Sequence, residues 1–115
     1  MNDLSVLYDE YYGSGIDLSN YFGSDSKDIS FIGFCCRDAL KVIEACKQKW
    51  LTVLGVDVYR ATNGSVEYFY LCWDLRPLSG ESVSDRFGRS ISESSKFIRS
   101  NNKSDLLFCL TIVKE

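Results

Sequence analysis

The chain contains no histidine among its 115 residues. Histidine is the commonest general base near neutral pH and the usual activator of a serine or cysteine nucleophile. Its absence excludes Ser-His-Asp and Cys-His catalysis and every histidine-based metal site. A Walker loop is also missing, and Gly13-Ser14-Gly15 has neither a preceding strand nor the third glycine of a dinucleotide-binding fingerprint. We therefore expect no catalytic residue, no bound cofactor and no metal.

An excess of basic charge is lacking as well. Lysine and arginine number 13 against 16 acidic residues, so the formal net charge is −3. Nucleic-acid binding, which needs a basic stripe, is not expected. The longest apolar run, residues 106–113, is far shorter than the roughly 20 residues that cross a bilayer. Since the first ten residues do not resemble a signal peptide, we expect a cytoplasmic protein without membrane contact.

The cysteines form no recognisable framework. Their number is five, which is odd, and no Cys-x-x-Cys pair occurs. We expect reduced, structural thiols, as in other cytosolic proteins. An alternative redox role for the vicinal pair Cys35-Cys36 is left open.

The remaining composition is that of a folded chain. Hydrophobic residues make up 45% and aromatic residues 14% of the sequence. A chain of this length can bury one hydrophobic core without metals or disulfides. We expect a single domain over residues 1–115.

The clearest local signal is a β-hairpin. Two strand-like runs flank Asn63-Gly64, the dipeptide best suited to the positive φ angles of a type I′ turn. The predicted strands cover residues 50–60 and 65–74. With Asn63 and Gly64 as the loop, we expect the opposed pairs to be Thr62 with Ser65, Arg60 with Glu67, Tyr59 with Tyr68 and Asp57 with Tyr70.

The predicted register divides the hairpin into two faces, because side chains alternate along a strand. The apolar face carries Leu54, Val56, Val58, Phe69, Leu71 and Trp73. The opposite face carries Gly55, Asp57, Tyr59, Tyr68, Tyr70, Cys72 and Asp74. We expect the first face to lie in the core and the second, where tyrosines meet carboxylates, to lie at the surface.

Helical periodicity marks three segments. We predict helices over Leu4–Tyr12, Asp38–Trp50 and Asp85–Ser100, the last with Ser84 as N-cap and Asn101-Asn102 as its end. Between the first two helices we expect a loop over residues 19–28 and a strand or extended segment over residues 29–34. The apolar stripe of the central helix consists of Ala39, Leu40, Val42, Ile43, Cys46 and Trp50.

The chain closes with Leu106–Val113, which is suited to a buried strand. A helix that connects two strands returns the chain to its starting end. This strand should therefore run parallel to the second hairpin strand, either beside it or antiparallel beside the first. The predicted class is α+β: a small, mainly antiparallel sheet of three or four strands with helices packed on one face.

The tyrosine-bearing face is the candidate binding site. Tyrosine supplies a large contact area and is enriched in binding hot spots. Cross-strand aromatic packing is a second role for the same rings, and the two roles are compatible. The candidate partner-binding residues are Asp57, Tyr59, Glu67, Tyr68, Tyr70 and Asp74.

Two charged pairs complete the prediction for the hairpin. An unbroken register separates Asp57 from Asp74 by about 12–14 Å. Paired glycosidase carboxylates lie roughly 5–9.5 Å apart, so we expect no catalysis from this pair. Arg60 and Glu67 are expected to form a cross-strand ion pair worth about 0–1 kcal/mol.

The order of segments over residues 30–113 resembles the immunity protein 40 family. The family pattern is similar to Gly-Gly-Asp-Val-Tyr followed by Tyr-Asp-Asn-Trp; here Val56 replaces the second glycine, and Leu71 and Cys72 replace the Asp-Asn pair. The matching segments are Asp38-Ala39-Leu40, Leu54-Gly55-Val56-Asp57-Val58-Tyr59, Tyr70-Leu71-Cys72-Trp73, Ser90 and Phe97-Ile98.

The resemblance implies a small bacterial protein of a polymorphic-toxin system that binds and neutralises a cognate toxin without catalysis. Assigning the tyrosine-bearing face to toxin binding is our own hypothesis. Two alternatives remain open at this stage. One is a small enzyme or ligand-binding domain with a pocket around Asp57 and the hairpin tyrosines, and the other is a structural module that forms homodimers through the same face.

Overall fold

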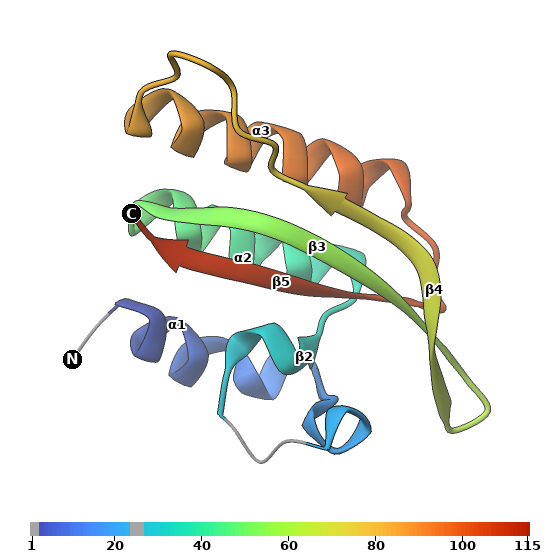
Figure 1. The fold of residues 1–115 in the computed structure, drawn as a ribbon. Coiled ribbons are helices and arrows are strands. Elements are labelled where there is room, and N and C mark those ends of the chain that lie inside the picture. The colour runs from blue at the N-terminus through green and yellow to red at the C-terminus, as the bar shows by residue number, and fades with distance from the viewer. Residues whose placement is uncertain (1–2, 24–26) are drawn as a thin grey trace.

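The computed structural model describes residues 3–23 and 27–115 (Figure 1). Residues 24–26, which belong to the loop predicted over residues 19–28, lie outside the described part. In chain order the elements are α1 (Asp3–Tyr11), η1 (Tyr12–Ser14), β1 (Ile16–Asp17), η2 (Ser19–Phe22), η3 (Ile29–Phe31), β2 (Ile32–Gly33), α2 (Cys36–Gln48), β3 (Leu51–Thr62), β4 (Ser65–Asp74), α3 (Val83–Ser100) and β5 (Leu106–Lys114), where η marks a 3₁₀ helix.

The main sheet has three antiparallel strands in the order β4-β3-β5. Because β5 pairs with β3, it runs parallel in direction to β4, which decides between the two placements that the sequence allowed. β1 and β2 form a separate two-stranded antiparallel sheet. α2 and α3 lie side by side against the main sheet, and α1 lies next to α2 and β5 (Figure 1). The predicted α+β class is confirmed.

The segment that carries β2 follows the outer edge of β5. Phe34 and Phe108 exchange two backbone hydrogen bonds, of 2.9 and 2.7 Å. Gly33 lies so close to β5 that an added Cβ would be 3.1 Å from the Cβ of Leu107. As a result, the face of the sheet away from α2 and α3 is covered over β5, where Leu107 and Cys109 are buried. The same face is exposed over β4 and partly covered over β3, where Asp57 and Tyr59 are half-buried.

The core lies between the sheet and the helices. Five consecutive residues of β5, Leu106 to Leu110, are buried, and Phe34 and Phe108 are among the largest side chains that are fully enclosed. As predicted, the partly buried Phe69, Leu71 and Trp73 pack against this core. The buried residues of α2 are Cys36, Ala39, Val42, Ile43 and Cys46.

A bulge in β3 accounts for a buried serine. Pairing with β5 shifts between Val53 and Gly55, which leaves Leu54 as an extra, half-buried residue. The Val53 N–H donates to the hydroxyl of Ser90 at 3.2 Å, and that hydroxyl donates to the Phe87 carbonyl at 2.8 Å. Ser90 is fully buried in α3. Its hydroxyl therefore satisfies a backbone donor between the sheet and the helix.

α3 begins earlier than its sequence indicated. The N-cap is Ser82, whose hydroxyl accepts from the Asp85 N–H at 3.1 Å, so the prediction of Ser84 as N-cap was wrong. Several serines in this segment suit a cap equally well, and the path of the preceding loop selects among them. Asn101 ends the helix as expected, but with φ −122° rather than in the left-handed region. Its side-chain amide donates to the Phe97 carbonyl at 2.8 Å.

Trp50 was expected on the apolar stripe of α2, but the structure places it outside that helix. The helix ends at Gln48, and Trp50 has φ 55° and an exposed fraction of 66%. Its indole stacks on Phe87 with ring centroids 4.9 Å apart. The chain must reverse at once into β3, and the left-handed backbone at Trp50 takes part in that reversal.

Candidate functional site

The hairpin turn has the predicted geometry. Asn63 and Gly64 have φ values of 50° and 78°, and positive φ at both central residues defines a type I′ turn. The ladder next to the turn keeps the expected register, with Thr62 opposite Ser65, Arg60 opposite Glu67 and Tyr59 opposite Tyr68.

Beyond Tyr59 the register shifts, because β4 contains a bulge. Asp57 lies opposite Cys72 and not opposite Tyr70, which corrects the fourth predicted pair. Three residues of β4, from Phe69 to Leu71, thus stand against Val58 alone. Two extra residues preserve the alternation of side chains, so Cys72 and Asp74 stay on the same face as Tyr68. We call Asp57, Tyr59, Tyr68, Tyr70, Cys72 and Asp74 the hairpin face.

A continuous row of aromatic rings crosses the hairpin face. Tyr59 and Tyr68 meet edge to face with centroids 5.4 Å apart, and Tyr68 and Tyr70 do so at 5.2 Å. Phe22 of η2 extends the row, 5.6 Å from Tyr59. Exposure rises along the row from the half-buried Tyr59 to Tyr68, at 37%, and Tyr70, at 89%. The sequence predicted a loop over residues 19–28, but it does not reveal that Phe22 of this segment packs against Tyr59.

The bulge also brings the two carboxylates of the face together. Asp74 lies opposite Gly55 and Asp57 opposite Cys72, so the two aspartates are diagonal neighbours on adjacent strands. Such neighbours have Cα atoms roughly 7–8 Å apart, and the predicted 12–14 Å was therefore wrong. An added Cβ at Gly55 would lie 3.2 Å from Asp74 Oδ1. The glycine leaves room for that carboxylate.

The charge on Asp57 is uncompensated. Burial raises the pKa of Asp57 above its ordinary value, and the negative charge of Asp74 raises it further. Among the described residues, no hydrogen bond and no ion pair reaches the Asp57 carboxylate. The charged form of Asp57 is thus less favourable in the folded chain than in water.

Neighbouring groups on the same face are affected in the same direction. Burial, followed by the charges of Cys109, Asp57 and Tyr68, raises the pKa of Tyr59 to about 12. Burial and then the charge of Asp57 raise the pKa of Cys109 to about 12. Both groups are therefore neutral near pH 7, and the formal charge of the hairpin face comes from Asp57 and Asp74.

Asp57→Asn is expected to leave the free protein as stable as the parent or more stable, by less than about 1 kcal/mol because the site is partly solvated. An acid whose pKa is raised on folding reduces stability at pH values above that pKa. The reduction disappears as the pH falls below the ordinary value of aspartic acid. Urea unfolding at pH 7 and pH 3.5 checks the sign, because the advantage of the variant should shrink at the lower pH. A variant less stable than the parent at pH 7 would contradict the uncompensated charge.

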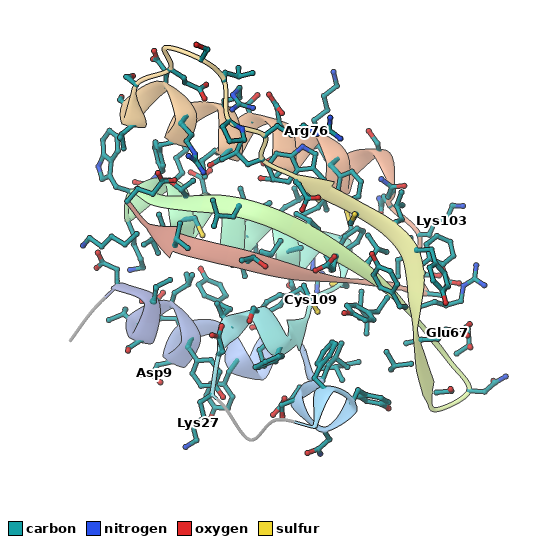
Figure 2. The ribbon with its side chains drawn as sticks, in the orientation of Figure 1. Asp9, Lys27, Glu67, Arg76, Lys103 and Cys109 are labelled. Atoms are coloured by element: carbon teal, nitrogen blue, oxygen red, sulfur yellow. The ribbon has the colours of Figure 1, made fainter. Side chains whose placement is uncertain are left out.

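Glu67 does not lie on the hairpin face, although it was a candidate binding residue. It is opposite Arg60, and alternation turns both side chains away from Tyr68. Figure 2 shows Glu67 toward the outer end of the hairpin. The predicted ion pair with Arg60 is also absent among the described contacts. Arg60 instead pairs with Asp105, Nε to Oδ2 at 3.2 Å, and its guanidinium lies 4.6 Å from the centroid of the Phe69 ring.

Other features of the surface lie away from this face. Three hollows of about 450, 380 and 410 Å³ are lined by residues outside β3 and β4. No group of three or more potential metal ligands occurs among residues 3–23 and 27–115. In the same ranges, no helix combines the length and the apolar character that a membrane span requires.

The fold and the hairpin face define a class of small α+β proteins in which a helix-covered sheet presents an open aromatic and acidic surface. The model of the family described as Immunity protein 40 matches residues 23–113. This chain belongs to the immunity protein 40 family. The matched range contains the whole hairpin face, and the resemblance noted in the sequence is confirmed. No match was found among curated proteins or solved structures.

Family membership implies a toxin protein as the partner. It does not identify that toxin or the residues that touch it. The hairpin face is therefore assigned below from its geometry and charge.

Proposed function

We propose that this chain is a non-catalytic cytoplasmic immunity protein that neutralises its cognate toxin by covering part of the toxin's surface. The hairpin face is the docking surface. Tyr59, Tyr68 and Tyr70 supply contact area, and Asp57 and Asp74 accept hydrogen bonds from basic groups of the toxin. The uncompensated carboxylate of Asp57, which lies on the same face as the aromatic row and beyond the bulge from Tyr68, is the observation that carries this proposal.

Electrostatics supports a basic partner. A half-buried carboxylate without a counter-charge lowers the stability of the free protein, and Asp74 adds to that effect. A lysine or arginine brought by the toxin would remove this unfavourable term when the complex forms. Groups that are unfavourable in the free fold are often found at functional sites. Charge of this kind mainly speeds encounter and sets specificity.

The aromatic row supports a preformed surface. Each ring of Tyr59, Tyr68 and Tyr70 rests against the next at 5.2–5.4 Å. These contacts restrict the side chains before the toxin arrives. Less conformational entropy is then lost on binding, which is the usual gain from pre-organisation.

The setting of the carboxylate pair favours binding over catalysis. Asp57 and Asp74 are diagonal neighbours, so the large separation that the sequence predicted no longer counts against acid/base chemistry. The pair nevertheless lies on an open sheet face, and none of the three hollows borders it. Docking uses such a surface directly, whereas a reaction requires a pocket that excludes water around the substrate.

Asp74→Lys is expected to slow association with the toxin about tenfold at low salt, and less at high salt, because steering is screened. The probe is an inactivated form of the toxin domain that we expect to be encoded immediately upstream of this chain's gene, and the measurement is stopped-flow binding at two salt concentrations. Glu67→Lys is the matched control, because it makes the same charge change on the other side of the ladder.

The control variant should associate more than threefold faster than Asp74→Lys at low salt. Growth protection by co-expression with the active toxin domain should fall in the same order. Equal association rates for the two variants would contradict the assignment of the hairpin face. A wild-type chain that neither binds nor protects against this toxin domain would contradict the proposed partner.

A further inference from the structure

Tyr70 has an unusual backbone for its position. Its φ is 58°, in the left-handed region that a bulky L-residue rarely adopts. The described chain contains two other non-glycine residues of this kind, Asn63 and Trp50. Asn63 forms the hairpin turn, and Trp50 takes part in the reversal after α2 and stacks on Phe87. Tyr70 lies within a strand, where no reversal requires a left-handed residue.

The fold obtains little from the Tyr70 side chain. The ring is 89% exposed, and its one described aromatic contact is with Tyr68. A glycine would adopt the same backbone without steric cost. The backbone around Tyr70 keeps its neighbours Phe69 and Leu71 on the core, but the Tyr70 side chain adds little to packing, and strained residues of this kind are characteristic of functional positions.

The bulge determines where this ring stands. The three residues Phe69 to Leu71 oppose Val58 alone, and the two outer ones pack against the core. Tyr70 is thereby pushed out of the ladder at the edge of the sheet, since β4 is an outer strand. Asp57 and Asp74 lie farther along the same face, beyond the bulge. Asp57 is opposite Cys72 in the first pair after the bulge, and Asp74 is two residues farther along β4, opposite Gly55.

We propose that the β4 bulge holds Tyr70 in this strained backbone so that its ring enters a concave pocket on the toxin whose rim is basic. This inference rests on the proposed function and names the chemistry of the toxin site. The pocket accommodates a phenol, and its rim meets the carboxylates of Asp57 and Asp74. Tyr70 is then the dominant contact, and Tyr59 and Tyr68 support it from the side.

The first test concerns the backbone and needs no partner. Tyr70→Gly should melt at a higher temperature than Tyr70→Ala, because glycine relieves the positive φ and alanine does not. At Tyr68, which has no positive φ, the order should be reversed, since glycine weakens a regular strand. If Tyr70→Ala melts above Tyr70→Gly, the proposed strain does not exist and the inference fails.

The second test concerns binding to the same inactivated toxin domain that serves as the probe for Asp74→Lys. Both Tyr70→Gly and Tyr70→Ala should bind about 30-fold or more weakly than wild type, as expected for a hot-spot tyrosine. Tyr70→Phe, which keeps the ring, should remain within about fivefold of wild type. The more stable glycine variant would then be a poor binder, a combination that loss of folding does not produce.

The outcomes separate the two proposals. Wild-type affinity in both Tyr70 variants, together with slow association of Asp74→Lys, would overturn the anchor role and leave the hairpin face as the docking surface. Wild-type affinity in Tyr70→Gly and Tyr70→Ala, together with wild-type binding by Asp74→Lys, would overturn the docking surface and the anchor together.

Discussion

Replacing Tyr68 and Tyr70 together with alanine is expected to weaken toxin binding by about 100-fold or more. The two rings are the most exposed tyrosines of the hairpin face, so the substitution removes contact area that the toxin would otherwise cover. The free energy of unfolding should fall by less than about 1 kcal/mol, because the main loss is the cross-strand contact with Tyr59. Isothermal titration calorimetry and urea unfolding measure the two quantities on the same samples.

A second tyrosine pair in the chain provides the control. Tyr8 and Tyr12 stack at 5.4 Å in the first helical segment, and Tyr12 is 55% exposed. Replacing both with alanine removes the same chemical groups at a distance from the hairpin. This control should bind the toxin as wild type does. Equal losses of affinity in the two double variants would show that tyrosine content, and not the hairpin face, determines binding.

Phe108→Ala is expected to lower the free energy of unfolding by about 3–5 kcal/mol. Phe108 is fully buried in β5, and its backbone joins the main sheet to the segment that carries β2. Truncation leaves a cavity at the point where the helices, the sheet and this segment meet. Small domains are stable by only about 5–15 kcal/mol, so a large part of the total is lost. Urea unfolding followed by circular dichroism gives the value.

Thr111→Ala is the matched control for this effect. Thr111 lies three residues farther along β5 and is exposed. Its replacement should change the free energy of unfolding by no more than about 0.5 kcal/mol. A loss below about 1.5 kcal/mol for Phe108→Ala would mean that Phe108 is not central to the core.

Local rules were sufficient for the hairpin near its turn. Asn63-Gly64 fixes a type I′ turn, and three of the four predicted pairs follow from it. The period-2 alternation then separates a core face from an open face. These features depend on residues close in sequence, and for that reason one sequence is enough to predict them.

The β4 bulge was not predictable in the same way. Nothing in Phe69-Tyr70-Leu71 indicates a bulge, since all three residues favour a regular strand. The bulge leaves Phe69 and Leu71 on the core while the ladder shifts beyond them. Both the position of Tyr70 and the closeness of Asp57 to Asp74 follow from this tertiary requirement. The sequence therefore predicted which residues lie on the hairpin face better than it predicted the distances between them.

Tertiary packing also decided the remaining differences. The polar loop before α3 offers several serines as caps, and Ser82 is used because of the path of the chain. Glu67 was included in the site for its charge. Because it pairs with Arg60, its side chain points to the side of the sheet away from the hairpin face. The contact of Phe22 with Tyr59 joins residues 37 positions apart, which no local pattern reveals.

Two exposed cysteines allow the most direct measurement of the central claim, that the open part of the sheet is where the toxin sits. Cys72 lies on the hairpin face and Cys35 precedes α2, whereas Cys36, Cys46 and Cys109 are buried. Maleimide labelling of the free chain and of its complex with the inactivated toxin domain, followed by mass spectrometry, gives a rate for each thiol. We predict that the complex slows labelling of Cys72 at least about tenfold and leaves Cys35 unchanged. Unchanged labelling of Cys72 in a saturated complex would show that the toxin binds elsewhere.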